Sequence, residues 1–470
     1  RMTDIIEEEP YVAIVYNDYL DSVCSSCFRE DTPLKIRNGQ QSPPKACKGC
    51  KKVYYCGADC QKNDWKIHKV ECKFLSAASV VPPYHVRMIA RLLIRRKRGD
   101  HSTLTAWNGR KLEDLMDHLS DFNNRLDILF DATKDYVSSE YMVDREEILG
   151  YGGKMMTNQF AIVGANDQYI GNGLYIGCSA FDHSCQPDLT RRSIGSKMVL
   201  RSQNREQTLD GIDKLKVTYT SPLNCTEERR KSLSSSYFFH CECRMCEDKD
   251  KDGYARSIKC ESCEDGICLV KDDSTFLLCL KCGTTNSITV EEAHKWNAHL
   301  VSVDDSGNGD VYFLTQCYDD MTSKLSRRNI NLANLAFRLC TAFYTSKAMR
   351  SIPLAAKYAE ACEEALMSMT TVGLPDRTSA LEILAQVAFE HEQVSPNSRR
   401  LLGMWREAVL ASNGTEDAAR EKGDEATLEM YANIKDVEKY FESVDDDDYD
   451  IDEERRKLEE LIRQMTVPEP

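Results

Sequence analysis

Cysteine spacing constrains the fold of this chain more than any other feature. The 470 residues include 21 cysteines, most of them in C-x-C or C-x2-C pairs. Such pairs are typical of metal sites, whereas disulfide frameworks belong mainly to small secreted domains. The N-terminus shows no charged-then-apolar signal segment, and no apolar run is long enough to cross a bilayer. We therefore expect a reduced, intracellular protein folded in part around zinc.

The first cysteine cluster offers seven thiols and one imidazole, enough for two tetrahedral zinc ions. A closed four-ligand site has no open position for water or substrate, so a structural role is expected. Because the segment is short and polar, metal binding must supply much of its folding free energy. The candidate ligands are Cys24, Cys27, Cys47, Cys50, Cys56, Cys60, His68 and Cys72.

The second cluster, "CECRMC" at 241–246, supplies three thiolates to a metal that needs four ligands. No suitable fourth donor lies nearby in sequence. We predict that Cys185, in "DHSCQPD" at 182–188, completes the site and closes a pocket between the two segments. The predicted ligands are Cys185, Cys241, Cys243 and Cys246.

The third cluster has the C-x2-C, fifteen residues, C-x2-C spacing of a zinc ribbon. Two short strands around an Asp-Asp-Ser turn are expected between its halves. Its predicted ligands are Cys260, Cys263, Cys279 and Cys282.

The first cluster resembles a MYND finger in its spacing, its Tyr54-Tyr55 pair and its Trp65. The resemblance implies interleaved zinc ligands and the binding of protein segments, often proline-containing ones. A finger that only braces its neighbour is the alternative. The implied sets are Cys24, Cys27, Cys56 and Cys60 around one zinc, and Cys47, Cys50, His68 and Cys72 around the other.

The segments that follow resemble the SET core of the SMYD protein-lysine methyltransferases. "DHSCQPD", "KVTYTSP" and "YFFHCECRMC" occur in the order of that branch, in which a MYND finger interrupts the SET domain. The resemblance implies S-adenosylmethionine-dependent methylation of lysine in histones or other proteins, with Tyr219 as the catalytic residue. The implied cofactor contacts are Asn158, Ser179, Asp182, His183 and Phe239, and the implied lysine channel includes Phe160 and Tyr237.

Methyl transfer to a lysine needs a neutral amine, alignment of the reactants and exclusion of water. An aromatic channel desolvates the ammonium group and lowers its pKa. It also attracts a cationic sulfonium by about 0.5–2 kcal/mol. Aromatic residues at these positions therefore suit the implied chemistry.

Two departures from the SMYD pattern leave a second hypothesis open. Asp182 and Asp188 stand where the family has asparagine, and an ionised carboxylate only accepts hydrogen bonds. We expect weaker cofactor affinity from this change. The family's Gly-x-Gly turn is absent before Cys24, and the leading Arg1-Met2 favours a chain without its natural start. The alternative function is a catalytically weak or inactive MYND–SET adaptor that binds protein partners.

The fold class expected is α+β, with a β-rich SET core split by the finger and a helical insert. Apolar residues at helical spacing predict helices over 84–97 and 111–122. The predicted regions are the N-terminal part of SET (1–23), the MYND finger (24–72), a helical insert (77–150), core SET (151–240), a post-SET segment with zinc ribbon (241–287), a helical TPR-like domain (288–440) and an acidic tail (441–470).

Charge and motifs also give expectations about ligands and partners. The net charge is −15, and a large part of it lies in the acidic run at 445–454. That run should be disordered, with an amphipathic helix over 453–465. The basic run at 95–98 is either a solvated helix end or a surface for an acidic partner. No DNA-reading helix is evident.

We therefore expect a monomer that acts on proteins and does not bind nucleic acid or membrane. Its expected location is the cytoplasm and the nucleus. Besides S-adenosylmethionine, four zinc ions are expected: two in the finger, one in the post-SET site and one in the ribbon.

Overall fold

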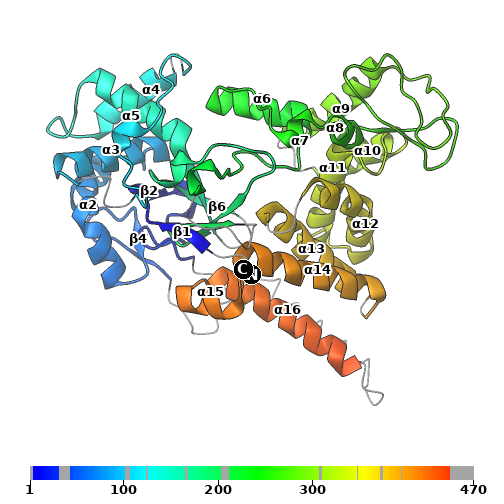
Figure 1. The fold of residues 1–470 in the computed structure, drawn as a ribbon. Helices are drawn as coiled ribbons and strands as arrows, with labels where there is room; N and C mark the ends of the chain where they lie inside the picture. The colour runs from blue at the N-terminus through cyan, green and yellow to red at the C-terminus, as the bar shows by residue number, and fades with distance from the viewer. Residues whose placement is uncertain are drawn as a thin grey trace.

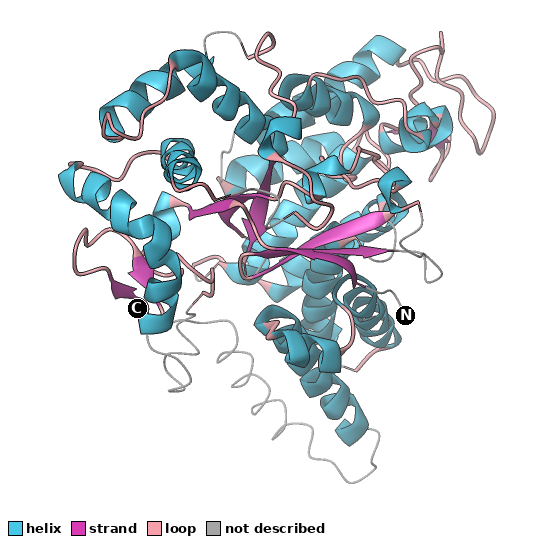
Figure 2. Cartoon of the chain, turned by 60° about the vertical axis from the view of Figure 1, so that its left-hand side comes forward, coloured by secondary structure: helices cyan, strands magenta, loops and turns pink. Residues whose placement is uncertain are grey.

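The computed structural model describes residues 4–30, 43–100, 106–122, 125–164, 168–202, 211–305, 310–346, 348–370, 374–392 and 394–444. Small antiparallel sheets lie at the centre, with helices α2–α5 on one side and helices α9–α14 on the other (Figure 1). Figure 2 shows most strands gathered at the centre of the molecule, with helices around them. This mixed architecture, with its cysteine clusters and helical C-terminal region, confirms the expected fold class.

Two three-stranded sheets form the central core, and each takes one strand from the N-terminal segment. In the first, β2 (Val12–Val15) pairs with β6 (Tyr169–Leu174), which pairs with β5 (Gln159–Val163). In the second, β1 (Asp4–Glu8) pairs with β8 (Lys197–Ser202), which pairs with β7 (Leu189–Ile194). Gly171 is required in β6, since a Cβ there would lie 2.4 Å from the Ile14 carbonyl oxygen.

The finger and the insert follow β2 in sequence. The finger contains β3 (Lys45–Ala46), β4 (Tyr54–Tyr55) and α2 (Ala58–Ala77), and the insert contains α3 (Tyr84–Lys97), α4 (Arg125–Tyr136) and α5 (Arg145–Asn158). Helix α3 coincides with the helix predicted over 84–97. Nine of its residues are buried, from Val86 to Ile94, and its C-terminal basic turn is exposed at Arg96 and Lys97.

The helix predicted over 111–122 is wrong. Only a single 3-10 turn forms there, Leu112–Asp114, and His118 has a left-handed φ of 47° that ends helical continuation. Lys154 of α5 donates to the carbonyl oxygen of Leu115 at 2.7 Å. A side chain from another helix therefore satisfies this backbone, and tertiary contacts override the local periodicity.

The segment after β8 carries the catalytic candidates and the remaining metal clusters. It contains η6 (Ile212–Lys214), α6 (Thr226–Tyr237), α7 (Arg244–Glu247), α8 (Lys249–Ala255), β9 (Ile258–Lys259) and β10 (Ile267–Cys268). The "KVTYT" stretch at 216–220 forms one parallel bridge, between Val217 and His183.

The two strands expected between the halves of the ribbon are only partly present. β10 is one of them, but it pairs with β9, which precedes the cluster. The second stretch makes isolated bridges, Cys268 to Cys279 and Leu278 to Thr285. Four metal-ligand candidates restrain this short segment, so an extended ladder is not needed to hold it.

Eight helices complete the described chain. They are α9 (Val290–Asp305), α10 (Val311–Thr322), α11 (Ile330–Thr345), α12 (Ile352–Met369), α13 (Pro375–Glu392), α14 (Pro396–Asn413), α15 (Glu416–Lys422) and α16 (Glu425–Val444). Buried alanines such as Ala336, Ala355 and Ala365 permit close helix packing. None of the helices in the described residues is both long and apolar enough to span a bilayer.

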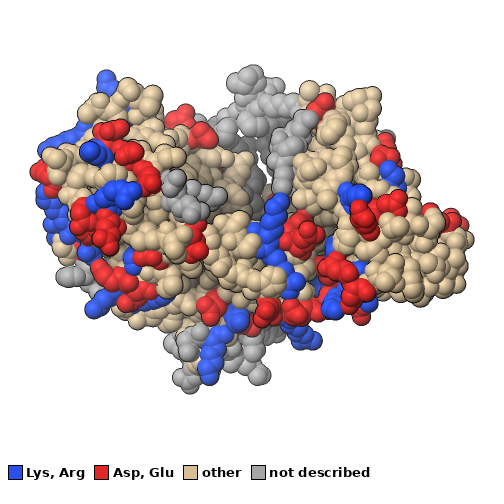
Figure 3. Space-filling view, turned by 90° about the horizontal axis from the view of Figure 1, so that it is seen from above, with Lys and Arg blue, Asp and Glu red and all other residues tan. Residues whose placement is uncertain are grey.

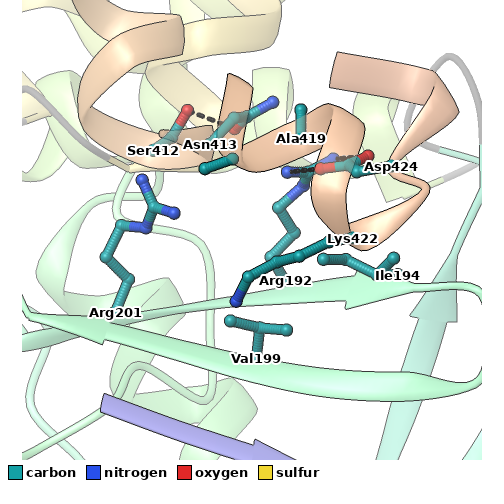
Figure 4. Close-up of a pocket in the computed structure, with 10 residues that line it drawn as sticks. Arg192, Ile194, Val199, Arg201, Ser412, Asn413, Ala419, Lys422 and Asp424 are labelled. Carbon is teal, nitrogen blue, oxygen red and sulfur yellow. Dashed lines mark hydrogen bonds and ion pairs between the residues drawn. The ribbon is translucent and has the colours of Figure 1, made fainter. Parts of the chain in front are cut away.

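The C-terminal helices return to the central sheet, where α14 and α15 lie against β7 and β8 (Figure 4). Arg192 of β7 forms an ion pair with Asp424, and Lys422 forms one with Glu7 of β1. Residues 441–444 continue α16, and the predicted disordered run and helix at 445–470 lie outside the described residues.

Candidate functional site

The finger brings its eight candidate ligands together in the two interleaved sets implied by the MYND pattern. The ligand atoms of each set lie within 4.8 Å of one another. Cys27 Sγ is 3.7 Å from Cys56 Sγ, and His68 Nε2 is 3.4 Å from Cys47 Sγ. Zn–S bonds of about 2.3 Å in a tetrahedron place sulfurs about 3.8 Å apart. The donor atoms therefore fit zinc.

Cys185 lies in one cluster with the three thiols of the downstream "CECRMC" segment. Its Sγ is 3.5 Å from Cys246 Sγ and 4.0 Å from Cys241 Sγ. The residues concerned are 56 and 61 positions apart. A metal at this cluster would tie the 182–188 segment to the post-SET segment.

The ribbon forms a fourth cluster from Cys260, Cys263, Cys279 and Cys282. Cys260 Sγ lies 3.7 Å from Cys282 Sγ. Gly266 covers the cluster closely, because a Cβ there would be 2.6 Å from Cys263 Sγ and 2.7 Å from Cys279 Sγ. The spacing of the sulfurs again fits a tetrahedral zinc ion.

An aromatic cluster surrounds Tyr219 beside the four thiols that include Cys185. The backbone N–H of Tyr219 donates to His183 Nδ1 at 3.0 Å, and its hydroxyl donates to the Phe181 carbonyl oxygen at 2.5 Å. The Tyr219 ring lies 4.7 Å from the Tyr237 ring and 6.4 Å from the Phe239 ring, between centroids. Three segments that are distant in sequence thus meet at one tyrosine.

Burial keeps the polar groups of this aromatic cluster neutral near pH 7. It lowers the pKa of His183 to about 4 and raises the pKa of Tyr219 to about 12. It also raises the pKa of Tyr237. A neutral hydroxyl can donate one hydrogen bond and still accept another, so Tyr219 can orient an amine while bound to Phe181.

Comparisons with known proteins bear on both the finger and the core. Residues 24–72 match the MYND finger family. The chain is 28% identical over 298 residues to SET domain-containing protein 14 of Caenorhabditis elegans, covering 60% of this chain and 64% of that protein. It is 27% identical over 322 residues to histone-lysine N-methyltransferase ASHR1 of Arabidopsis thaliana, covering 64% of this chain and 62% of that protein. Over 219 residues it is 31% identical to human histone-lysine N-methyltransferase SMYD3, covering 44% and 49%.

These matches support a SMYD-family protein. In each of the three cases the matched part is less than two thirds of the relative's length. The family match covers the finger at 24–72. The aromatic cluster around Tyr219 lies outside that match, in the segments that resemble the SET core.

The other sequence-predicted residues of the SMYD site fall into two groups. Asn158 Nδ2 donates to the carbonyl oxygens of Met116 and Lys154 at 2.9 and 2.8 Å, and Ser179 Oγ donates to Ile176 O at 2.8 Å. Both side chains are therefore engaged with backbone. Asp182, by contrast, is exposed.

Phe160 and Asp188 also have defined surroundings. Phe160 is buried in β5, and the Arg191 guanidinium lies 5.6 Å from its ring centroid. Burial raises the pKa of Tyr219 and Tyr237, and the Arg191 charge opposes that rise at both, so this arginine lies between Phe160 and the aromatic cluster. Asp188 accepts from the backbone N–H of Lys216 at 2.9 Å, which holds the 182–188 segment against the stretch that leads to Tyr219.

Sequence reasoning missed the segment at 107–110, which packs beside the aromatic cluster. The Trp107 ring stacks on Phe181 at 5.9 Å, and Asn108 Nδ2 donates to the Gly177 carbonyl oxygen at 3.3 Å. Arg110 Nη1 is buried and has no hydrogen-bond partner in the described part of the chain. The Asn-Gly turn after a tryptophan was the one available signal.

Glu8 was also missed. Its carboxylate accepts from the backbone N–H groups of Gly177 and Cys178, both at 2.8 Å, and so fixes the end of the run that leads into the 182–188 segment. Burial raises the pKa of Glu8 to about 7, against these hydrogen bonds, which favour the charged form. Its position in the middle of the acidic triplet at 7–9 gave no sign of burial.

A buried charge network joins the finger to α3. Glu71 of α2 accepts from Arg87 Nε at 3.0 Å and from Arg91 Nε at 2.7 Å. The side chains of Glu71 and Arg87 are both fully buried. Glu71 Oε2 also lies 3.7 Å from Nδ1 of His68, the ring nitrogen that faces away from the zinc set. Carboxylates in this position orient zinc-binding histidines.

Proposed function

We propose that this protein is an S-adenosylmethionine-dependent protein-lysine N-methyltransferase acting on histones or other proteins. One observation carries the proposal: Cys185 shares a metal-ligand cluster with the 241–246 segment, and the rings of Tyr219, Tyr237 and Phe239 meet beside it. The names of similar proteins, histone-lysine and N-lysine methyltransferases, support the same activity.

The aromatic cluster can prepare a lysine for methylation. Its rings lower the pKa of an entering ammonium group, so the lysine loses a proton to solvent as it enters. Once the neutral amine is bound, the rings exclude water from it. The Tyr219 hydroxyl keeps its own proton and is held by the Phe181 carbonyl, so it can accept a hydrogen bond from the amine N–H. Most of the rate enhancement should come from holding the amine in line with the methyl group.

S-adenosylmethionine, when bound, supplies the methyl group as part of a sulfonium. His183 and Phe239, whose ring centroids are 5.8 Å apart, would border it. Aromatic faces attract such a cation. The buried, unpartnered Arg110 Nη1 is suited to a carboxylate of the cofactor's amino-acid group. These residues fit the cofactor without the side chains of Asn158 and Ser179.

The second candidate function is a MYND–SET adaptor that binds protein partners without efficient catalysis. The hydrogen bonds of Asn158 and Ser179 to backbone favour it, because both side chains would have to turn to contact a cofactor. An exposed Asp182 in place of asparagine favours it further, since a carboxylate cannot donate a hydrogen bond.

A labelled methyl-transfer assay tests the proposal. The protein is incubated with methyl-labelled S-adenosylmethionine and with histones or a mixture of cytosolic proteins. Tyr219→Phe should reduce transfer by about 100-fold or more, since it removes an interaction made at the reacting amine. Tyr344→Phe is the matched control, because it removes a buried hydroxyl that donates to Glu390 at 3.0 Å in the helical domain.

The two variants separate the two candidate functions. Transfer by the wild type and by Tyr344→Phe, with loss in Tyr219→Phe, supports the enzyme. Equal transfer by all three proteins removes Tyr219 from the mechanism. No transfer by any of them, with binding of protein segments retained, supports the adaptor.

We also propose the finer points of zinc content, partners and location. Four zinc ions per chain are expected by elemental analysis, two from the finger and one each from the post-SET cluster and the ribbon. The finger is proposed to bind protein segments. We further propose that the protein is a monomer, binds neither nucleic acid nor membrane, and is found in cytoplasm and nucleus. Sedimentation tests the oligomeric state, and cell imaging tests the location.

A further inference from the structure

We propose that the outer face of the zinc ribbon is a docking surface for a basic protein segment that carries apolar side chains. Three large apolar residues stand at every second position of the ribbon's second half. Phe276 is 57% exposed, Leu278 48% and Leu280 55%. The residues between them, Leu277 and Cys279, are 0% and 2% exposed. This alternation defines one solvent-facing apolar row, here called the ribbon stripe.

The backbone of the ribbon stripe is hydrogen-bonded to neighbouring segments on both sides, so the stripe is not at a free edge. Leu280 N donates to the Ile267 carbonyl oxygen at 2.9 Å on one side. Asn286 N donates to the Leu277 carbonyl oxygen at 2.8 Å on the other. The intervening Cys279 is a metal-ligand candidate. The stripe is therefore preorganised, which lowers the entropic cost of binding.

The stripe is unpartnered because the other face of the ribbon is already used. Ile258, Cys268, Val270 and Leu277 belong to the large buried cluster that includes the C-terminal helices. The ribbon itself lies at the outer end of the molecule, beyond α8 and α10 (Figure 1). Solvent-exposed apolar rows of this kind mark interaction sites.

The charge around the ribbon stripe favours a basic binding partner. Between Cys260 and Cys282 the chain has five acidic and two basic residues. Asp272 and Asp273 are ion-paired with Arg256 and Lys249, so the acidic excess rests on the three acidic residues of the ribbon's first half, at 261, 264 and 265. Glu264 and Asp265 are exposed. Four thiolates around one Zn²⁺ add further negative charge. The end of the molecule where the ribbon lies shows acidic groups beside a broad area without charge (Figure 3). A basic segment with apolar side chains complements both features.

Other occupants are disfavoured by the same charge. Nucleic acids and anionic lipid surfaces would be repelled by an acidic ribbon. A second copy of the chain would bring like charge against like charge at this face. Docking on the ribbon is independent of methyl transfer, because the ribbon stripe shares no residue with the aromatic cluster around Tyr219.

The test measures binding of a defined probe to the full chain. The probe is a fluorescein-labelled peptide of alternating lysine and valine, followed by fluorescence anisotropy at about 0.15 M salt, where distant surface charges are screened. The variant Phe276→Ser with Leu278→Ser and Leu280→Ser should raise Kd at least about tenfold. Glu264→Lys, which leaves the apolar row intact, should also raise Kd. A peptide with glutamate in place of lysine should not bind.

A matched triple variant controls for loss of exposed apolar surface elsewhere. Tyr312, Leu354 and Leu410 are 71%, 39% and 42% exposed and lie in the helical domain. Changing all three to serine should leave the Kd for the probe unchanged. Zinc content is measured for every variant, and Glu264→Lys keeps the test valid if the ribbon triple variant loses its metal.

Four results would overturn the proposal. The first is an equal Kd for the wild type and both ribbon variants. The second is equal binding of the glutamate peptide. The third is a concentration-dependent dimer, seen by sedimentation and abolished by the ribbon triple variant, which would make a second copy the occupant. The fourth is stripe-dependent binding to phosphatidylserine vesicles, which would make it a lipid surface.

Discussion

Glu71→Gln should destabilise the protein far more than an equivalent change at its surface. The Glu71 carboxylate is fully buried and is shared by Arg87 and Arg91. Burial alone would raise the pKa of Glu71, but the charges of the two arginines outweigh it and lower the pKa. The carboxylate is therefore ionised in the folded protein, and glutamine would remove its charge.

The expected cost follows from what remains after the substitution. Arg91 keeps Asp64, whose Oδ1 is 2.9 Å from Arg91 Nη1. Arg87 has two guanidinium nitrogens, Nη1 and Nη2, that are buried without hydrogen-bond partners in the described residues. With Glu71 neutral, Arg87 becomes an uncompensated buried charge. Breaking a buried pair in this way costs about 3–5 kcal/mol, a large part of a typical total of about 5–15 kcal/mol.

Glu113→Gln is the matched control. Glu113 accepts from Arg96, which belongs to the same helix as Arg87, but the two side chains are 58% and 40% exposed. An exposed pair contributes only about 0–1 kcal/mol. Both variants are compared by urea denaturation, followed by intrinsic fluorescence, and by the rate of zinc release to a chromophoric chelator. Glu71→Gln should also release zinc faster, because Glu71 faces the His68 ring.

A difference of less than about 1 kcal/mol between the two substitutions in the free energy of unfolding would show that the Glu71 ion pairs do not carry the predicted stability. A large loss of stability with an unchanged rate of zinc release would support the predicted role of the buried ion pair. It would contradict the predicted effect of Glu71 on the His68 ring.

Three further changes test other parts of the structure. Glu8 has a pKa of about 7 in the folded chain, above the 4.5 of an exposed glutamate, so wild-type stability should fall as pH rises from about 4.5 to 7, by at most about 3 kcal/mol. Glu8→Gln should remove this fall in pH-dependent denaturation curves, and an identical fall in the variant would contradict the assignment. Gly266→Ala should cost one zinc ion per chain by elemental analysis because a Cβ would enter the ribbon's cysteine cluster, whereas Gly403→Ala, with open space around it, should retain all zinc. Asp424→Asn should lower stability by about 1–3 kcal/mol by leaving Arg192 unpaired between the central sheet and the C-terminal helices (Figure 4), and unchanged urea denaturation would show that this ion pair is dispensable.

The metal clusters could be read from the sequence because most of their ligands are close neighbours in the chain. Pairs such as Cys260 and Cys263 are brought together by a short turn, whatever the rest of the molecule does. Cys185 was inferred differently, from a missing fourth ligand, and the structure places it in the cluster. The coordination number of zinc thus predicted one long-range contact, between Cys185 and the 241–246 segment, that hydrophobic periodicity could not predict.

Local pattern failed where distant groups satisfy the backbone. The stretch 111–122 has helical periodicity, but Lys154 of another helix binds its carbonyl oxygens. Asn158 and Ser179 stay predicted cofactor contacts, and the spacing gave no sign that their side chains donate to the carbonyl oxygens of Met116 and Ile176. Hydrogen-bond partners of single side chains depend on packing, which spacing alone does not specify.

The mixed fold class and most members of the four candidate metal-ligand clusters could be predicted from the amino-acid sequence, since each depends on residue type and short spacing. Three features became visible only in the folded chain: Arg110 and Glu8 lie beside the candidate site, Glu71 binds two arginines of α3, and one face of the ribbon is exposed. Those features arise from contacts between segments far apart in the chain. Their free energy depends on burial, which no local pattern of residues contains.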